Sequence, residues 1–346
     1  MSTDPLLDVR DLHVSFRTED GVVRAVDGVS LKVNPGEVLG IVGESGSGKS
    51  VSMMSVMRLI IDPNAVFEGQ VMYKGRDLMG LSQAQMQDVR GSEIAMIFQD
   101  PMTSLNPVYR IGWQIEEQLR AHQKLSDKEA RARVVALLRA VGIPNPETRA
   151  ADYPHQFSGG MRQRVMIAMA LSCDPDLLIA DEPTTALDVT IQAQILDLIK
   201  RLKAEFNSAV ILITHDMGVV ADIADRVMVM YGGRVVEEGT KHEIFTNPQH
   251  PYTWGLLDSI PRLDRPRPKR LSAIPGQPPS LVRLPPGCAF NPRCGHRFDR
   301  CLHEVPELKS SGEGAHRDAC HLDQEAKRAR RAAGAAAADP TLAESV

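Results

Sequence analysis

The stretch "GESGSGKS", Gly43 to Ser50, decides which fold this chain adopts. It matches the pattern G-x-x-x-x-G-K-[S/T], and it lies between the apolar run "VLGIV" and the helix-like "VSMMSVMRLI". Glycines allow successive backbone N–H groups to converge on phosphate oxygens, and the helix N-terminus adds its positive dipole end. The stretch therefore predicts a phosphate-binding loop between a buried strand and a helix.

Two side chains of this loop have predicted tasks of their own. The Lys49 ammonium should reach the β and γ phosphates of a bound nucleotide, and the Ser50 hydroxyl should bind Mg2+. The remaining loop contacts are expected from four further residues: Gly43, Ser45, Gly46 and Gly48. The glycines also contain a G-x-G fragment, which is too short to indicate a dinucleotide-binding fold.

A second acidic motif, "LLIADEP", ends a predicted buried strand in Asp181 and Glu182. A carboxylate at the tip of a core strand can bind Mg2+ beside the loop serine, which is the task predicted for Asp181. Glu182 is then predicted to orient and deprotonate an attacking water. The alternative is an acidic pair that only opens a turn before Pro183.

The apolar pattern along the chain predicts an α/β fold. "LLDVRDLHVSF" and "VVRAVDGVSLKV" alternate with a period of two, as half-buried antiparallel strands do. "EVLGIVG", "AMIFQD", "LLIADEP" and "AVILITHD" are continuous apolar runs, typical of strands buried in a parallel sheet. Residues from about 105 to 170 are mainly helical in pattern, and "RVMVMYGGRVVEEG" predicts a hairpin turning at Gly232 and Gly233.

The composition is that of an ordinary soluble globular protein, with 346 residues, 43% hydrophobic and 24% charged. The formal net charge of -4 gives no global argument for binding nucleic acid. The basic strings "PRPKR" and "KRARR" are interpreted as a solvated linker and tail rather than a nucleic-acid site. No apolar run approaches the roughly eighteen residues that cross a bilayer, so a cytoplasmic location is expected.

The motif "FSGGMRQR" connects these observations to a known family. A serine and two glycines that open a helix form another set of N–H donors for phosphate. With this motif placed before the Asp181 strand, the chain resembles the ATP-binding cassette (ABC) family. In that family this signature contacts ATP held by the opposite subunit. The resemblance implies a RecA-like parallel core, an antiparallel β subdomain and a helical subdomain. It assigns the signature to Ser158, Gly159 and Gly160, although Phe157 and Met161 stand where the family often has leucine and glutamine.

The resemblance implies four further site residues. Gln99 in "IFQDP" matches the glutamine that touches Mg2+ and the attacking water, and His215 in "LITHD" matches the histidine that senses the γ phosphate. Asp188 in "TTALDV" matches the loop that crosses the dimer interface. Phe16 in "HVSF" could stack under adenine, or it could be an ordinary core residue of a strand.

The sequence "NPQHPYTWGLLDSIP" followed by "IPGQPPSL" is similar to the extension of ATP-binding subunits of oligopeptide and dipeptide permeases. This implies a peripheral protein at the cytoplasmic face of a bacterial inner membrane, with a second ATPase subunit, two permease subunits and an extracytoplasmic peptide-binding protein. Importers of nickel or an oligosaccharide and non-transport ABC ATPases are the alternatives. The expected division is a cassette over 1–260, an extension over 261–322 and a disordered tail over 323–346.

Four of the five cysteines lie in that extension: Cys288, Cys294, Cys301 and Cys320. Zinc sites usually contain a pair spaced C-x2-C to C-x4-C, which is absent here, whereas four looser thiolates can bind an iron–sulfur cluster. The permease resemblance implies a [4Fe-4S] cluster. A structural role is expected for it, because the proline-rich extension has little apolar sequence from which to build its own core. Zinc, with His296, His303 or His316 as substitute ligands, and unliganded thiols remain open, while Cys173 is expected to be a buried thiol.

Overall fold

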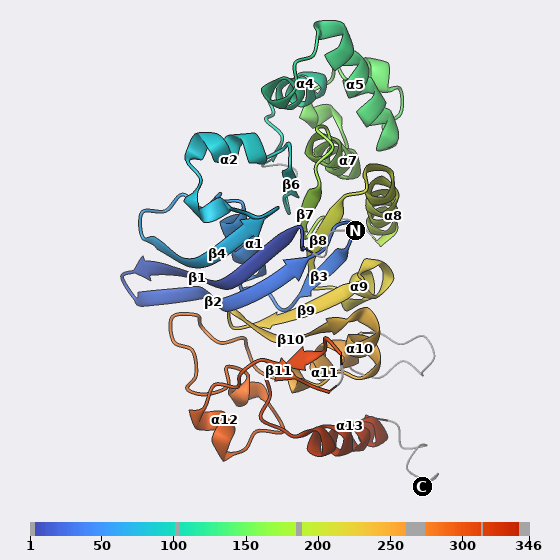
Figure 1. Ribbon diagram of the computed structural model, residues 1–346. Coiled ribbons are helices and arrows are strands. Elements are labelled where there is room, and N and C mark those ends of the chain that lie inside the picture. Colours follow the sequence, from blue (N-terminus) through green and yellow to red (C-terminus); the bar gives the residue numbers. More distant parts are fainter. Residues whose placement is uncertain (1–3, 101–103, 185–188, 261–273, 313, 339–346) are drawn as a thin grey trace.

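The computed structural model describes residues 4–100, 104–184, 189–260, 274–312 and 314–338 (Figure 1). Within these residues the strands form two sheets. The antiparallel sheet has the order β2-β1-β4-β5, with β1 (Leu7–Thr18), β2 (Gly21–Val33), β4 (Ala65–Tyr73) and β5 (Arg76–Asp77). The larger sheet has the order β11-β12-β10-β9-β3-β8-β7-β6, with β3 (Val38–Val42), β6 (Ile94–Ile97), β7 (Leu177–Asp181), β8 (Ala209–Thr214), β9 (Arg226–Tyr231), β10 (Arg234–Thr240), β11 (Lys309–Ser310) and β12 (Arg317–Asp318).

The centre of the larger sheet is parallel and buried, as the apolar runs predict. Strands β9, β3, β8, β7 and β6 pair in parallel, and every residue of β3, β6, β7 and β8 is buried. Strand β10 instead returns antiparallel to β9 through a turn at Gly232 and Gly233, both with positive φ, which confirms the predicted hairpin. Parallel strands put their carboxyl ends at one edge of the sheet. Val42 at the end of β3 and Asp181 at the end of β7 therefore lie at the same edge, on either side of β8.

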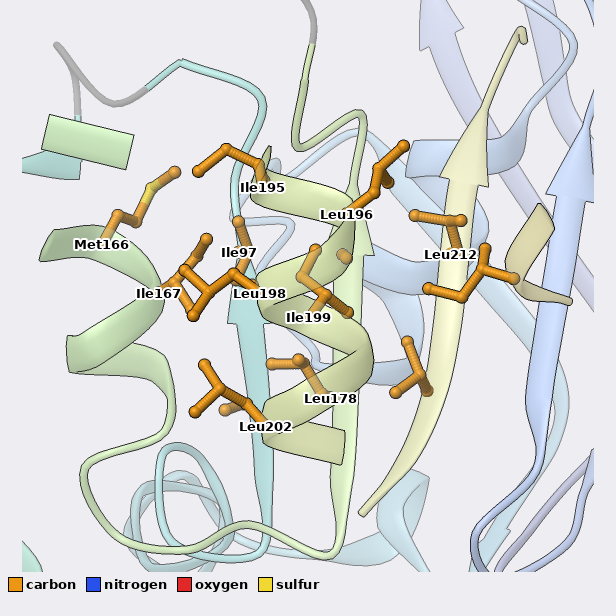
Figure 2. Packing of buried hydrophobic residues seen from close by; sticks show 14 of the residues in the cluster. Ile97, Met166, Ile167, Leu178, Ile195, Leu196, Leu198, Ile199, Leu202 and Leu212 are labelled. Atoms are coloured by element: carbon orange, nitrogen blue, oxygen red, sulfur yellow. The ribbon is translucent and has the colours of Figure 1, made fainter. Parts of the chain in front are cut away.

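Helices cover the sheets and supply the rest of the core. Figure 2 shows how α8 inserts Ile195, Leu198 and Ile199 between α7 and the parallel strands. The helices are α1 (Lys49–Val56), α2 (Gln83–Val89), α4 (Ile111–His122), α5 (Asp127–Ala140), α6 (Pro146–Arg149), α7 (Gly159–Ala170), α8 (Val189–Phe206), α9 (Met217–Ile223), α10 (Lys241–Thr246), α11 (Pro251–Asp258), α12 (Asp299–His303) and α13 (Gln324–Ala338). Short 3-10 turns are η1 (Leu78–Gly80), η2 (Pro154–Gln156) and η3 (Asn291–Arg293). No described helix combines the length and the apolar character needed to cross a lipid bilayer.

The predicted helical insertion corresponds to α4 through α7, at the opposite end of the molecule from the C-terminal segments (Figure 1). Helix α5 begins with a capping box, in which Ser126 accepts from the Glu129 N–H and the Glu129 carboxylate accepts from the Ser126 N–H. This reciprocal cap explains why the charged stretch "DKEARARVVALLRAVG" is a helix from its first residue.

The C-terminal region, here residues 274–312 and 314–338, packs on the edge of the larger sheet. Strand β12 pairs antiparallel with β10, so this region extends the sheet of the cassette. The expectation of a disordered tail from residue 323 is wrong for residues 324–338, which form α13. Alanine favours helix, and the buried Lys327 ammonium donates to both carboxylate oxygens of Asp318 at 2.8 and 2.7 Å, which anchors the helix.

Candidate active site

The phosphate-binding loop leaves β3 at Val42 and enters α1 at Lys49, as predicted. Gly48 has φ of +94°, and a Cβ there would lie 2.3 Å from the Ala25 carbonyl oxygen, so only glycine fits. Gly48 also caps α1 without any side-chain hydrogen bond, which leaves the first N–H donors of the helix to an external anion. A Cβ on Gly46 would meet no atom within 4 Å, so the concave side of the loop is open.

Lys49 is held inside this loop and is 4% exposed. Its ammonium donates to the carbonyl oxygens of Gly43 at 2.7 Å and Glu44 at 2.9 Å. Burial lowers the pKa of Lys49, and the nearby carboxylates of Glu182, Asp181 and Glu44 oppose that shift. The ammonium is therefore oriented by backbone and surrounded by acidic groups.

The predicted Mg2+ ligands lie together at the end of β7. The Ser50 hydroxyl donates to a carboxylate oxygen of Asp181 at 2.8 Å. Burial raises the pKa of Asp181, while the hydrogen bond from Ser50 and the charge of Lys49 lower it. A hydroxyl and a carboxylate are oxygen donors of the kind that Mg2+ prefers, so this pair fits the ion.

Glu182 follows in a left-handed conformation, with φ of 45°, immediately after the strand. The Gln99 amide donates to its carboxylate at 3.1 Å, and the Nδ1 atom of His215 lies 3.5 Å from the same oxygen. Two side chains, which follow the ends of β6 and β8, therefore converge on this carboxylate. They border a cavity of about 490 Å³, lined by Glu44, Ser45, Gly46, Ser47, Gly48, Lys49, Ser50, Val51, Gln99, Glu182 and His215.

Other predicted site residues lie away from the lining of this cavity. Ser158 and Gly159 are exposed, and the Ser158 hydroxyl caps α7 by accepting from the Met161 N–H. Phe16 is half-buried on β1 and packs against the core of the antiparallel sheet, so its contact with adenine stays a prediction. Asp188 lies outside the described residues.

The four cysteines of the extension are brought to one small enclosed pocket. Cys288, Cys294, Cys301 and Cys320 line it together with two histidines that the sequence did not single out, His250 and His321. Of the proposed substitute ligands, His296 lines the pocket, His303 does not, and His316 instead contacts Glu237 at 2.8 Å.

Burial raises the pKa of three of these thiols: Cys294, Cys288 (to about 11) and Cys320 (to about 12). Among the described residues, no three His, Cys, Asp or Glu side chains are arranged as a site for a metal ion. The fifth cysteine, Cys173, is a buried thiol in the core, as predicted.

Two contacts to the loop come from residues that the sequence did not single out. Arg293 and Tyr252 both bind Glu44, although they lie more than two hundred positions away in the chain. Each is far in the chain from any recognised nucleotide motif: Tyr252 lies on α11 and Arg293 in the C-terminal region.

The fold and the loop define an ATP-hydrolysing cassette, and comparison with known proteins agrees. Residues 26–185 match the family described as "ABC transporter", and residues 236–301 match "Oligopeptide/dipeptide transporter, C-terminal region". The oligopeptide transport ATP-binding protein OppD of Bacillus subtilis is 57% identical over 304 residues, covering 88% of this chain and 85% of the relative. The dipeptide transport ATP-binding protein DppD of the same organism is 55% identical over 304 residues, covering 88% and 90%.

The protein belongs to the family of ABC transporter ATP-binding subunits that carry the oligopeptide/dipeptide transporter C-terminal region. A solved dimeric ATP-binding cassette, bound to ADP and Pi in a post-hydrolysis state, is similar with a TM-score of 0.61 and 28% identity. The match covers 68% of this chain and 98% of the chain in that structure. The α/β cassette fold expected from the sequence is thereby confirmed, and this family binds ATP with Mg2+ and hydrolyses it.

Proposed function

We propose that this protein is the ATP-hydrolysing subunit of a bacterial importer for dipeptides or oligopeptides. The proposal is carried by the presence, in one chain, of the candidate ATP-site residues around one cavity and a C-terminal region of the peptide-transporter type. The first feature accounts for ATP hydrolysis. The second points to peptides as the cargo of the transporter in which this subunit acts.

In the proposed site, the loop N–H groups and the Lys49 ammonium bind the β and γ phosphates of ATP. Ser50, Asp181 and Gln99 would provide ligands for Mg2+, which neutralises charge on the phosphates. The 2.8 Å contact between Ser50 and Asp181 supports this assignment because both oxygens are then directed at one small region.

Glu182 is the proposed general base for the attacking water. Its carboxylate borders the cavity, and both Gln99 and His215 contact it, so its orientation is restricted from two sides. Gln99 and His215 are accordingly proposed to hold Glu182 and the water in the geometry for in-line attack.

We further propose that each complete site needs a second cassette. The signature residues Ser158 and Gly159 are exposed and are absent from the cavity formed by their own chain, which supports a role toward ATP on another subunit. The partner is a second ATP-binding subunit of similar type, and Asp188 is proposed to lie in the interface with it. ATP closes the two cassettes, and hydrolysis removes the phosphate that joins them.

The proposed contact with a permease subunit lies beside the Gln99 segment. A cavity of about 230 Å³ is lined there by apolar residues of β6 and α7, and Phe98 at its edge is 39% exposed. Nearby, the exposed rings of Tyr109 and Trp113 stack at 4.2 Å between centroids. An apolar helix end of a permease fits such a surface. Two permease subunits, an extracytoplasmic peptide-binding protein and a peripheral location at the inner membrane follow from this assignment.

Transport by the reconstituted complex tests the proposal. The protein, its partner ATPase and the permease subunits would be placed in proteoliposomes with the binding protein, and uptake of labelled dipeptide, pentapeptide, Ni2+ and an oligosaccharide would be measured. ATP-dependent uptake of a peptide is expected. If Ni2+ or the oligosaccharide is taken up and the peptides are not, that compound is the substrate and the peptide assignment is wrong. ATP hydrolysis without uptake of any of these compounds would argue against an importer.

For the cysteine pocket we propose a [4Fe-4S] cluster, with zinc as the alternative. Four thiols that line one pocket match the ligand set of such a cluster. The cluster would supply folding free energy to a proline-rich segment with little apolar core of its own.

Metal analysis of anaerobically purified protein tests this assignment. Iron and acid-labile sulfide near four each per chain are expected, and Cys294→Ser should lose both while residues beyond about 270 become more sensitive to protease. Cys173→Ser is the matched control, because that thiol lies in the core and should leave the iron unchanged. Stoichiometric zinc without sulfide would reject the cluster, and an equally protease-resistant C-terminal region in Cys294→Ser would reject its structural role.

A further inference from the structure

The C-terminal region holds the phosphate-binding loop through a pair of buried contacts to Glu44. Both carboxylate oxygens of Glu44 accept from the Arg293 guanidinium, at 2.5 Å from Nη1 and 3.0 Å from Nη2. The Arg293 side chain is 5% exposed, whereas that of Glu44 is 29% exposed, and Glu44 lines the ATP-site cavity. This two-point geometry fixes both the position and the plane of the carboxylate.

Arg293 is itself oriented by groups other than Glu44. Its Nε atom donates to the Pro275 carbonyl at 2.9 Å, and its Nη atoms lie 3.3 Å from the Ile274 carbonyl oxygen and the Tyr231 hydroxyl. The guanidinium therefore keeps its direction without depending on the loop. It serves as a fixed support, and Glu44 is the group that is positioned.

Tyr252 holds the same loop residue from the backbone side. The Glu44 N–H donates to the Tyr252 hydroxyl at 2.8 Å, and the Glu44 carbonyl accepts from the Lys49 ammonium at 2.9 Å. The Tyr252 ring is fully buried and packs on Tyr231 and Phe290, with ring centroids 4.6 and 5.4 Å apart. The residue that orients Lys49 is thus held by α11 and by the C-terminal region together.

We propose that Arg293 and Tyr252 are positioning residues of the ATP site, so that the C-terminal region sets the affinity of the phosphate-binding loop for nucleotide. This inference rests on the ATP site proposed above. Without Arg293, the Glu44 carboxylate would stand as an uncompensated negative charge at the edge of a cavity that takes phosphates. Arg293 directly precedes Cys294, which lines the cysteine pocket. The conformation of that pocket therefore affects Arg293 through one peptide bond, and Arg293 in turn contacts Glu44 of the loop.

Nucleotide binding by the full-length chain tests the proposal. Arg293→Met should raise the dissociation constant for a fluorescent N-methylanthraniloyl-ATP by about tenfold, since a carboxylate is released beside the phosphates. Arg300→Met is the matched control, because Arg300 lies in the same region, pairs with Glu304 on the surface and is 54% exposed. In the reconstituted complex, Arg293→Met should raise the KM for ATP by a similar factor while kcat changes less than twofold.

A second substitution separates positioning from simple structural support. Glu44→Gln removes the charge that Arg293 neutralises, so the double variant Arg293→Met, Glu44→Gln should recover nucleotide affinity to within about threefold of Glu44→Gln alone. A purely structural role of Arg293 would not be rescued in this way. Tyr252→Phe should weaken binding by a smaller factor, because the Glu44 N–H loses its partner while the ring packing remains.

Three results decide between the explanations. A dissociation constant for Arg293→Met within twofold of the parent would overturn the proposal, as would failure of Glu44→Gln to restore affinity. If Arg293→Met does not fold, Arg293→Lys replaces it and should show an intermediate loss, because lysine keeps the charge but not the two-point contact. Lys49→Ala is the reference: if it leaves binding unchanged, the ATP site itself is wrong, whereas weakened binding there with unchanged Arg293 variants rejects only the positioning role.

Discussion

A single carboxylate, Glu182, is the proposed general base for ATP hydrolysis. Glu182→Gln keeps the shape of the side chain and its contacts with Gln99 and His215 but removes the base. We expect the turnover of the complex to fall by about a hundredfold or more, with ATP binding retained. Single-turnover hydrolysis and equilibrium binding measure the two quantities separately. Glu68→Gln, an exposed glutamate on β4, is the control; near-normal turnover in Glu182→Gln would remove the assignment.

The site residues that the sequence singled out share one property: their positions depend on local backbone. Lys49, Ser50 and Asp181 each sit at a strand end or helix start that short motifs specify, and the structure brings them to one cavity or within hydrogen-bonding distance of it. Arg293 and Tyr252 could not be found in this way. Their contacts with Glu44 depend on how the C-terminal region packs, and nothing in the neighbouring letters encodes that packing.

Ser158, at the start of helix α7, has two roles: its hydroxyl caps the helix, and it belongs to the proposed signature. Ser158→Arg should impair the site whose lysine belongs to the partner, since a bulky cation replaces the exposed hydroxyl at the helix N-terminus. It also removes the cap on the Met161 N–H, at a cost of about 1 kcal/mol. The rate of ATP hydrolysis by the assembled complex should fall by at least about tenfold, because the two cassettes can no longer close on the ATP. The thermal unfolding temperature of the isolated chain should fall by only a few degrees.

Ser126→Ala provides the comparison, because it removes the equivalent cap from α5 without adding bulk. It should lower thermal stability by a similar amount and leave hydrolysis near the parent rate. If Ser126→Ala and Ser158→Arg reduce hydrolysis equally, the loss comes from stability, and the signature assignment is wrong.

Helix α11 begins at a histidine that has to stay neutral. His250 is buried and accepts the Tyr252 N–H, and burial lowers the pKa of His250 to about 4, with Lys327 lowering and Asp318 raising it. The unfolded chain binds this proton from about pH 6.5 downward. The contribution of His250 to stability is therefore complete above pH 6.5 and is lost as pH falls toward 4, by about 3 kcal/mol at most.

His250→Asn keeps a cap acceptor for α11 but cannot titrate in this range. The difference in thermal stability between parent and variant should therefore shrink between pH 7 and pH 4.5. A parent-to-His250→Asn difference that stays constant over the same range would contradict the buried neutral histidine.

Elements that depend on local pattern agree with the sequence prediction, and those stabilised by distant contacts do not. The apolar runs identify the strands β3 and β8, which are buried along their whole length, and the Gly232-Gly233 pair identifies the hairpin turn. The helix α13 was missed because its alanine-rich composition is typical of a disordered tail. The Lys327–Asp318 pair that anchors it depends on a distant contact, because Asp318 belongs to β12, which pairs with β10.

At the scale of the whole molecule, the proposed arrangement gives one chain half of each of two sites. The cavity contains the phosphate-binding loop and Glu182, while the exposed Ser158 and Gly159 point to a site on another chain. The isolated protein should therefore hydrolyse ATP at least about tenfold more slowly per chain than the complex, because part of the closed geometry is missing. The rate per chain should rise with protein concentration or with added partner and permease. Hydrolysis measured from nanomolar to micromolar protein gives this dependence. Glu182→Gln at each concentration subtracts any contaminating ATPase. A chain that reaches the full rate of the complex at nanomolar concentration would have to complete its own site, and the two-cassette arrangement would then be wrong.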